Sequence, residues 1–208
     1  MAITVDELVV ADPPQAWSTA GFTVTDGTCR VGDVGIRLVG RERGIGIIGW
    51  ALRGLDARDI DGIPTAVAGG APTAPAEHAN GVTGIDHIVV LSPDVDRTVA
   101  ALAAVGMTPR RERLGTLGGR PIRQVFFRFG AVIIEVVGAP DPAGDGPSTL
   151  WGITYNVADI DRTAAYFSGR TTPVKDAVQP GRRITTVGHQ QFGMSVRTAM
   201  LSAPILSS

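Results

Sequence analysis

His87 and Glu135 are the two residues of this 208-residue sequence whose types and surroundings point most directly to chemistry. His87 lies in the segment GIDHIVVLS and Glu135 in AVIIEVVG, and both segments read as β-strands. A carboxylate in an apolar cavity has its pKa raised by desolvation, which would make Glu135 a general base for a proton next to a carbonyl group. A half-exposed strand on which Glu135 faces water is the alternative, because alternation alone does not say which face is wet.

These two residues could also hold a metal ion. Neutral imidazole is a good ligand for Zn, Fe or Ni, and a carboxylate suits the same ions or Mn. Because divalent sites usually have three or four protein ligands, His87 and Glu135 would need another donor. His189, His78 or Glu7 could supply it, but no spacing in the sequence requires this. A histidine that lines a cavity or hydrogen-bonds to a neighbour is the simpler interpretation, so the favoured expectation is that no metal binds.

Alternation along the strand around His87 gives a more detailed prediction. Residues two apart share a face of a strand, so His87, Val89 and Leu91 are expected on one face. Asp86 and Ile88 are then expected on the other.

Arg182, Arg183 and Trp151 are the remaining candidates for ligand binding. The two arginines follow the turn QPG, where their guanidinium groups could clamp a carboxylate or phosphate, although such pairs are more often simply solvated. Trp151 could line an aromatic pocket, although core packing is the commoner role of such a side chain.

Composition and charge exclude several classes of protein. With 44% hydrophobic and 19% charged residues the chain is globular rather than disordered. A net charge of -1 gives no reason to expect nucleic acid or an anionic membrane as a partner. The single cysteine, Cys29, rules out an internal disulfide framework and suits a reducing compartment. Because the N-terminus does not read as a signal peptide and no apolar run is long enough to span a membrane, we expect a cytoplasmic protein.

An internal repeat determines the expected architecture. The motif DVDRT at residues 94–98 returns as DIDRT at residues 159–163, and each copy follows an apolar strand at the same spacing. Each copy also begins a helix, with Asp94 a candidate N-cap, and three extended segments follow it. Residues 4–40 read as a third, divergent copy of this strand–helix–three-strand unit, and residues 47–68 as a truncated fourth.

This unit resembles the module of the vicinal oxygen chelate (VOC) superfamily, which includes glyoxalase I, extradiol dioxygenases and bleomycin resistance proteins. The segments DHIVVLSPDVDRTVAAL, FFRFGAVIIEVVG and WGITYNVADIDRTAAYF carry the resemblance. It implies an α+β fold in which paired βαβββ modules form a cupped mixed sheet, with a partial additional module at the N-terminus. We expect a partial module over residues 1–70, a linker over 71–83, and a glyoxalase-like domain over 84–208 with modules at 84–138 and 149–202.

The resemblance also implies a metal site that this sequence only half preserves. His87 matches the first-strand histidine and Glu135 the last-strand glutamate of the metal-dependent members. In the second module Gly152 stands where the second histidine would be, and residues 198–201 offer no carboxylate.

The implied function is therefore left with two alternatives. The first is a glyoxalase-like lyase, isomerase or dioxygenase that holds a small organic molecule in the cupped sheet, with Glu135 as the catalytic residue and a degenerate site for Zn, Fe, Mn or Ni. The second is a non-catalytic binding or sequestering protein of the bleomycin-resistance type, without metal. A homodimer is an open alternative to a monomer in both cases.

Overall fold

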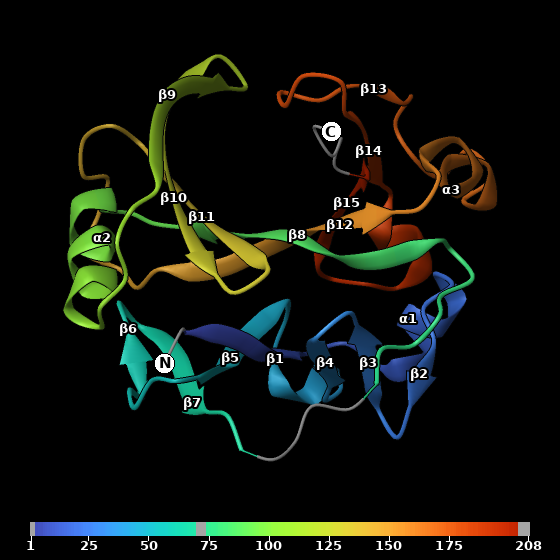
Figure 1. Cartoon of the computed structure of the whole chain (residues 1–208), viewed down its shortest axis with the longest axis horizontal. Coiled ribbons are helices and arrows are strands. Elements are labelled where there is room, and N and C mark those ends of the chain that lie inside the picture. The colour runs from blue at the N-terminus through green and yellow to red at the C-terminus, as the bar shows by residue number, and fades with distance from the viewer. Residues whose placement is uncertain (1–2, 70–73, 204–208) are drawn as a thin grey trace.

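Two β-sheets stacked on one another make up the protein (Figure 1). The coordinates are a computed structural model, which describes residues 3–69 and 74–203. The N-terminal sheet has the strand order β2-β3-β4-β1-β5-β7-β6 and the C-terminal sheet the order β13-β14-β15-β12-β8-β11-β10-β9. Of the segment expected as a linker, residues 71–73 lie outside the described residues, and β8 already begins at Val82.

The elements of the N-terminal half have the following bounds: β1 (Thr4–Val10), α1 (Pro14–Thr19), β2 (Val24–Thr25), β3 (Thr28–Val31), β4 (Val34–Leu38), η1 (Arg41–Arg43), β5 (Ile47–Arg53), β6 (Asp59–Ile60) and β7 (Ile63–Val67). The C-terminal half contains β8 (Val82–Leu91), α2 (Val95–Ala104), β9 (Arg111–Leu117), β10 (Arg120–Phe129), β11 (Val132–Gly138), β12 (Thr149–Val157), α3 (Ile160–Tyr166), β13 (Lys175–Asp176), β14 (Arg183–Val187), η2 (His189–Phe192) and β15 (Arg197–Ser202). No described helix is both long and apolar enough to cross a membrane.

The C-terminal sheet has the pairing expected of two βαβββ units. β8 and β12 are antiparallel neighbours at its centre, β11 runs parallel to β8, and β15 runs parallel to β12. The outer strands β9, β10, β13 and β14 curl up on both sides of this centre, so that the sheet forms a cup (Figure 1). The predicted α+β fold with a cupped mixed sheet is confirmed.

The N-terminal sheet follows the same pairing pattern in shorter form. β1 is antiparallel to β5 and parallel to β4, while β5 is parallel to β7. The first unit keeps a short helix, α1, but β5 passes directly to β6 without one.

The repeated aspartates cap the helices that follow them, as the sequence predicts for Asp94. The Asp94 carboxylate accepts a hydrogen bond from the Arg97 backbone amide at 3.0 Å. Asp159 does the same for the amides of Asp161 and Arg162, at 3.0 and 3.1 Å. Each carboxylate satisfies amide groups that a helix N-terminus leaves unpaired, which fixes where the helix begins.

Apolar side chains fill the space between the two sheets. Trp50 of β5 stacks on Phe129 of β10 at a centroid distance of 5.9 Å, and Phe22 meets Tyr155 of β12 at 5.2 Å. Cys29 is also fully buried here, and this burial raises the pKa of its thiol to about 12. A thiol with so high a pKa is a poor nucleophile.

The threonine of each repeated motif attaches its helix to the N-terminal half. Thr98 donates a hydrogen bond to the Asp61 carboxylate at 2.5 Å, beside an Arg97–Asp61 ion pair of 2.6 Å. Thr163 donates to the Asn80 carbonyl at 2.8 Å. The same motif therefore makes polar contacts to residues before β8 in both copies.

His78 fastens the segment before β8 to the N-terminal sheet. Its Nδ1 accepts a hydrogen bond from the Thr23 amide and its Nε2 donates to the Arg30 carbonyl, each at 3.1 Å. Burial lowers the pKa of the imidazole, and the hydrogen bond to Arg30 only partly offsets this. Both ring nitrogens are thus engaged, so His78 is not free to ligate a metal.

This geometry predicts an acid-sensitive contribution of His78 to stability. The unfolded chain takes up a proton on this residue near pH 6.5, above the pH at which the folded ring does, so stability is lost as the pH falls from about 6.5 toward the folded pKa. We expect the free energy of unfolding to fall less steeply between pH 7.5 and 5.5 in His78→Gln than in the unmodified protein. The difference in slope is bounded by about 1.4 kcal/mol per pH unit for one proton. Denaturant titrations at several pH values measure it, and equal slopes would contradict the prediction.

Candidate functional site on the concave face

The register of the C-terminal sheet places Glu135 and His87 together on its concave face. Glu135 of β11 pairs with Val89 of β8. This pair lies two residues along the strands from the pair formed by Ile133 and His87, and therefore on the same face of the sheet. The distance from Glu135 Oε2 to His87 Nε2 is 3.5 Å. The Glu135 side chain is 12% exposed and that of His87 is 20% exposed. Of the two alternatives for Glu135, the structure therefore has the one in which it faces the cup.

Simple alternation predicts that Asp86 lies on the face of β8 opposite to His87, but in the structure it does not. Along β12, the neighbours Thr154 and Tyr155 pair with His87 and Ile85, which leaves Asp86 as an extra residue in β8. Such a β-bulge interrupts the alternation of side chains. The Asp86 carboxylate consequently lies 2.9 Å from His87 Nδ1. Because a carboxylate only accepts, Nδ1 is the donor and Nε2 is the ring nitrogen that faces Glu135.

A buried arginine holds Asp86 from its other side. Arg182 Nη1 lies 2.7 Å from Asp86 Oδ1, and both side chains are almost fully buried, at 6% and 7% exposed. Arg182 also donates to the Asn156 side chain at 2.5 Å and to the Ser202 carbonyl at 2.7 Å. Burial by itself would raise the pKa of Asp86, but the hydrogen bonds and positive charges of His87 and Arg182 outweigh it, so this pKa lies below its ordinary value. Asp86 is therefore a charged anchor for the His87 ring.

Gln124 and Arg113 orient Glu135, the other member of the His87–Glu135 pair. Arg113 Nη2 and Nε donate to Gln124 Oε1 at 2.5 and 2.9 Å, so the amide nitrogen of Gln124 must point the other way. That nitrogen donates to Glu135 Oε1. Glu135 Oε1 is thereby anchored, while Oε2 remains directed at His87. Sequence reasoning missed Gln124, although a glutamine inside the apolar strand RQVFFRF was a signal that it has a buried partner.

These contacts join into one polar chain across the cup, which runs through Arg113, Gln124, Glu135, His87, Asp86 and Arg182. Glu135 Oε2 and His87 Nε2 lie at its centre, and the other polar atoms of these two side chains are hydrogen-bonded. A carboxylate and an imidazole held this way can accept and donate protons, or can bind polar groups of a ligand.

The concave face does not supply the ligands that a resident divalent ion requires. Cβ of a residue at position 152 would lie 2.9 Å from the Arg197 carbonyl oxygen, so β12 has no room for a ligand side chain at Gly152. Ala199 of β15 occupies the position that corresponds to Glu135, since it pairs with Thr154 as Glu135 pairs with Val89. Within residues 3–69 and 74–203 there is no cluster of three histidine, cysteine, aspartate or glutamate side chains that could hold a metal.

The remaining ligand candidates from the sequence occupy separate places. Trp151 is 37% exposed, and the Arg197 guanidinium lies over its ring at 4.7 Å, a cation–π contact. Arg183 points to the surface, where it forms a 2.6 Å ion pair with Asp161 of α3. Arg182 and His87 therefore belong to the polar chain, whereas Trp151 and Arg183 have no contact with it among those the structure shows.

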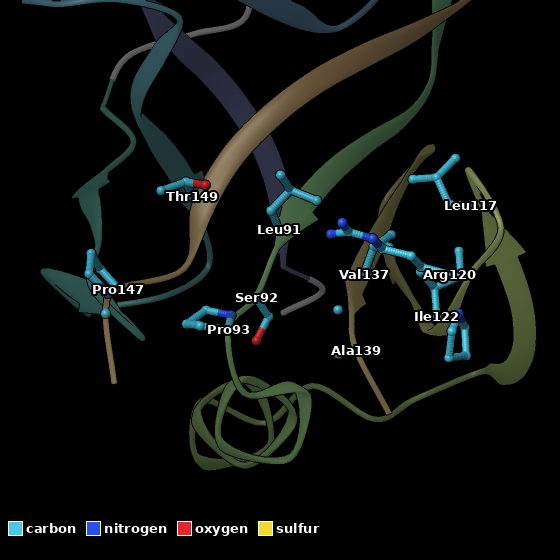
Figure 2. Close-up of a pocket in the computed structure, with 13 residues that line it drawn as sticks. Leu91, Ser92, Pro93, Leu117, Arg120, Ile122, Val137, Ala139, Pro147 and Thr149 are labelled. Atoms are coloured by element: carbon cyan, nitrogen blue, oxygen red, sulfur yellow. The ribbon is translucent and has the colours of Figure 1, made fainter. Parts of the chain in front are cut away.

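An apolar hollow of about 690 Å³ lies where β8 and β11 end (Figure 2), and no residue of the polar chain lines it. Its walls include Leu91 of β8, Val137 of β11 and Ile122 of β10. Val137 follows Glu135 by two residues and thus lies on the same strand face, about 7 Å further along. Ligand sites in proteins are typically clefts of about 300–1,000 Å³ with mostly apolar walls, a range that includes this hollow.

Comparisons with known proteins support the fold. No family model matches the sequence, and no curated protein matches it. Among solved structures, a variant of 4-hydroxymandelate synthase from Streptomyces coelicolor superposes with a TM-score of 0.63 at 14% identity, over 100% of this chain and 94% of that one. Catechol 2,3-dioxygenase gives 0.59 at 12% identity, over 96% and 88% of the two chains. A variant of homoprotocatechuate 2,3-dioxygenase from Brevibacterium fuscum gives 0.56 at 12% identity, over 98% and 71%.

The chain therefore has the VOC fold that its repeat predicts. Because all three identities lie far below 25%, this likeness concerns the fold alone, and the function has to be argued from the site.

The contacts of the polar chain predict that replacing Arg182 lowers the free energy of unfolding far more than replacing the adjacent Arg183. Arg182→Met leaves the buried Asp86 carboxylate without its arginine partner, and breaking a buried ion pair in this way costs about 3–5 kcal/mol. Arg183→Met removes only an exposed ion pair with Asp161, and we expect it to leave the stability nearly unchanged. Urea titrations of the two variants measure the difference. A loss below about 1 kcal/mol for Arg182→Met would show that the pair does not stabilise this fold.

The close approach at Gly152 gives a second stability prediction. Gly152→Ala places a methyl group against the Arg197 carbonyl, and such overpacking costs about 1–3 kcal/mol. Gly84→Ala, in the neighbouring strand β8, is the matched control because its Cβ meets nothing within 4 Å. Thermal unfolding of both variants is the measurement, and equal midpoints would contradict the prediction.

Proposed function

We propose that the protein binds a small organic molecule in the cup of its C-terminal sheet and moves a proton on it, with Glu135 as the base. The observation that carries this proposal is the pair Glu135 Oε2 and His87 Nε2, 3.5 Å apart. Asp86 and Gln124 fix the orientations of the two side chains, so the two atoms are held next to each other on the concave face. Catalytic groups need this preorganisation because a misplaced base loses much of its effect.

The proposed chemistry needs only side chains of this chain. Glu135 Oε2 removes a proton from a carbon next to a carbonyl group, and the electron pair of that C–H bond moves toward the carbonyl oxygen. His87, held by Asp86 through Nδ1, directs Nε2 at that oxygen and can stabilise the charge that develops on it. Return of the proton to a different position gives an isomerase, and departure of a neighbouring group gives a lyase. Dioxygenase chemistry is not proposed, because the residues at the cup do not fit a resident metal ion.

A binding protein without catalysis is the second candidate. Gly152 and Ala199 leave the second half of the cup without ionisable side chains at the positions equivalent to His87 and Glu135. A protein that only sequesters its ligand needs no second set of polar groups, and a shaped apolar site is sufficient for it.

Hydrogen exchange into substrates separates the two candidates. We expect at least one compound from a panel of 2-oxo acids, 3-oxo acids and simple ketones to exchange its α-hydrogens in D₂O in the presence of the protein, followed by proton NMR. Glu135→Gln should slow this exchange by about 10²–10⁴-fold, the usual contribution of a general base, while leaving the melting temperature unchanged. A metal chelator should have no effect on the rate.

Glu112→Gln is the matched control, because Glu112 is an exposed glutamate of β9 that pairs with Arg123 outside the polar chain. Exchange that survives in Glu135→Gln would remove Glu135 as the base. Saturable binding of panel compounds without any exchange would favour the sequestering protein.

A further inference from the structure

Arg120 places a cationic side chain at the edge of the apolar hollow. Arg120, the first residue of β10, lines the hollow, and Figure 2 shows its side chain extended over it toward Leu91. No hydrogen bond or ion pair of the Arg120 side chain occurs within the part of the chain that the structure describes. Its neighbour Arg123 differs, since it pairs with both Asp96 and Glu112.

We propose that the hollow takes the apolar part of an amphipathic organic acid, and that Arg120 pairs with the anionic group of this ligand. This inference rests on the proposed function for the placement of the reacting carbon near Glu135, and adds the class of molecule that binds.

The order of residues along the concave face determines where the rest of such a ligand lies. Gln124 pairs with Val137, Val137 with Leu91, and Leu91 with Thr149, so these residues form one row across the sheet. Glu135 belongs to the adjacent row of the concave face, about 7 Å away along its strand. A ligand whose reactive end meets Glu135 therefore extends its remaining carbons directly onto Val137 and Leu91.

Charge determines which end group suits the hollow. A guanidinium group binds carboxylates and phosphates through paired hydrogen bonds. Apolar neighbours strengthen this attraction because they lower the local dielectric constant. A neutral chain would gain only apolar contact there, and an amine would be repelled by Arg120. Both carboxylate and phosphate fit the shared chemistry of an anion on an apolar chain, so the two have to be distinguished by experiment.

The test is a calorimetric titration of the full chain with straight-chain carboxylates from butanoate to octanoate, with octyl phosphate, and with octanol. We expect each added CH₂ group to tighten binding about fourfold, the value for burial of one methylene. Arg120→Gln should weaken octanoate or octyl phosphate about fivefold or more, near the upper value for an exposed ion pair, and should leave octanol unchanged. Whichever of the two anions binds more tightly identifies the end group.

Two further variants complete the test. Arg162→Gln removes an exposed arginine of α3 and should change nothing. Ala139→Phe adds a ring to the wall of the hollow, and should weaken octanoate but not butanoate. Affinity independent of chain length, or equal affinity of Arg120→Gln and the unmodified protein for both anions, would overturn the inference. Because Glu135-dependent exchange of short compounds is measured separately, that outcome would leave the proposed function standing, and loss of exchange alone would leave this inference standing.

Discussion

Burial of the convex face of the C-terminal sheet against the N-terminal sheet is the constraint on which this structure depends. Trp50 and Phe22 meet Phe129 and Tyr155 across that interface, and the central strands contribute side chains that are entirely removed from water. A strand with one buried face has to put its polar residues on the other face or give each of them a partner. Gln124, Glu135 and His87 accordingly lie on the concave face, where they contact one another.

Equivalent β-bulges in β8 and β12 carry different residues, and this makes the two halves of the cup different. In β8 the extra residue is Asp86, and the bulge brings its carboxylate to His87. In β12 the extra residue is Trp151, which lies at the surface, while Gly152 lies against the Arg197 backbone. The same irregularity in two equivalent strands thus builds an ion network in one half and leaves no room for a side chain in the other. The different residues inserted at these equivalent bulges, Asp86 and Trp151, therefore contribute to the asymmetry of the site.

The sequence predicted the fold because the repeated motif contains its own structural signals. Asp94 and Asp159 cap helices, and apolar strands precede both at equal spacing, so the order of elements followed without any long-range information. The concave pairing of His87 and Glu135 also agrees with that order. The role of Asp86 could not be predicted, because a bulge depends on the register between strands and not on the residues of one strand. The partnership of Arg182 with Asp86, 96 residues away along the chain, depends on tertiary structure in the same way.

The threonine contacts of the repeated motif have a consequence for how the chain can be divided. Thr98 and Thr163 fasten the helices of the C-terminal half to Asp61 and Asn80, beside an interface of stacked aromatic rings. A fragment that starts at β8 would open this whole surface to solvent, and an exposed apolar face of that kind attracts a second molecule or precipitates. The N-terminal sheet therefore serves as a covalently attached partner, which gives the cupped sheet within one polypeptide the covering that it would otherwise need from a neighbour.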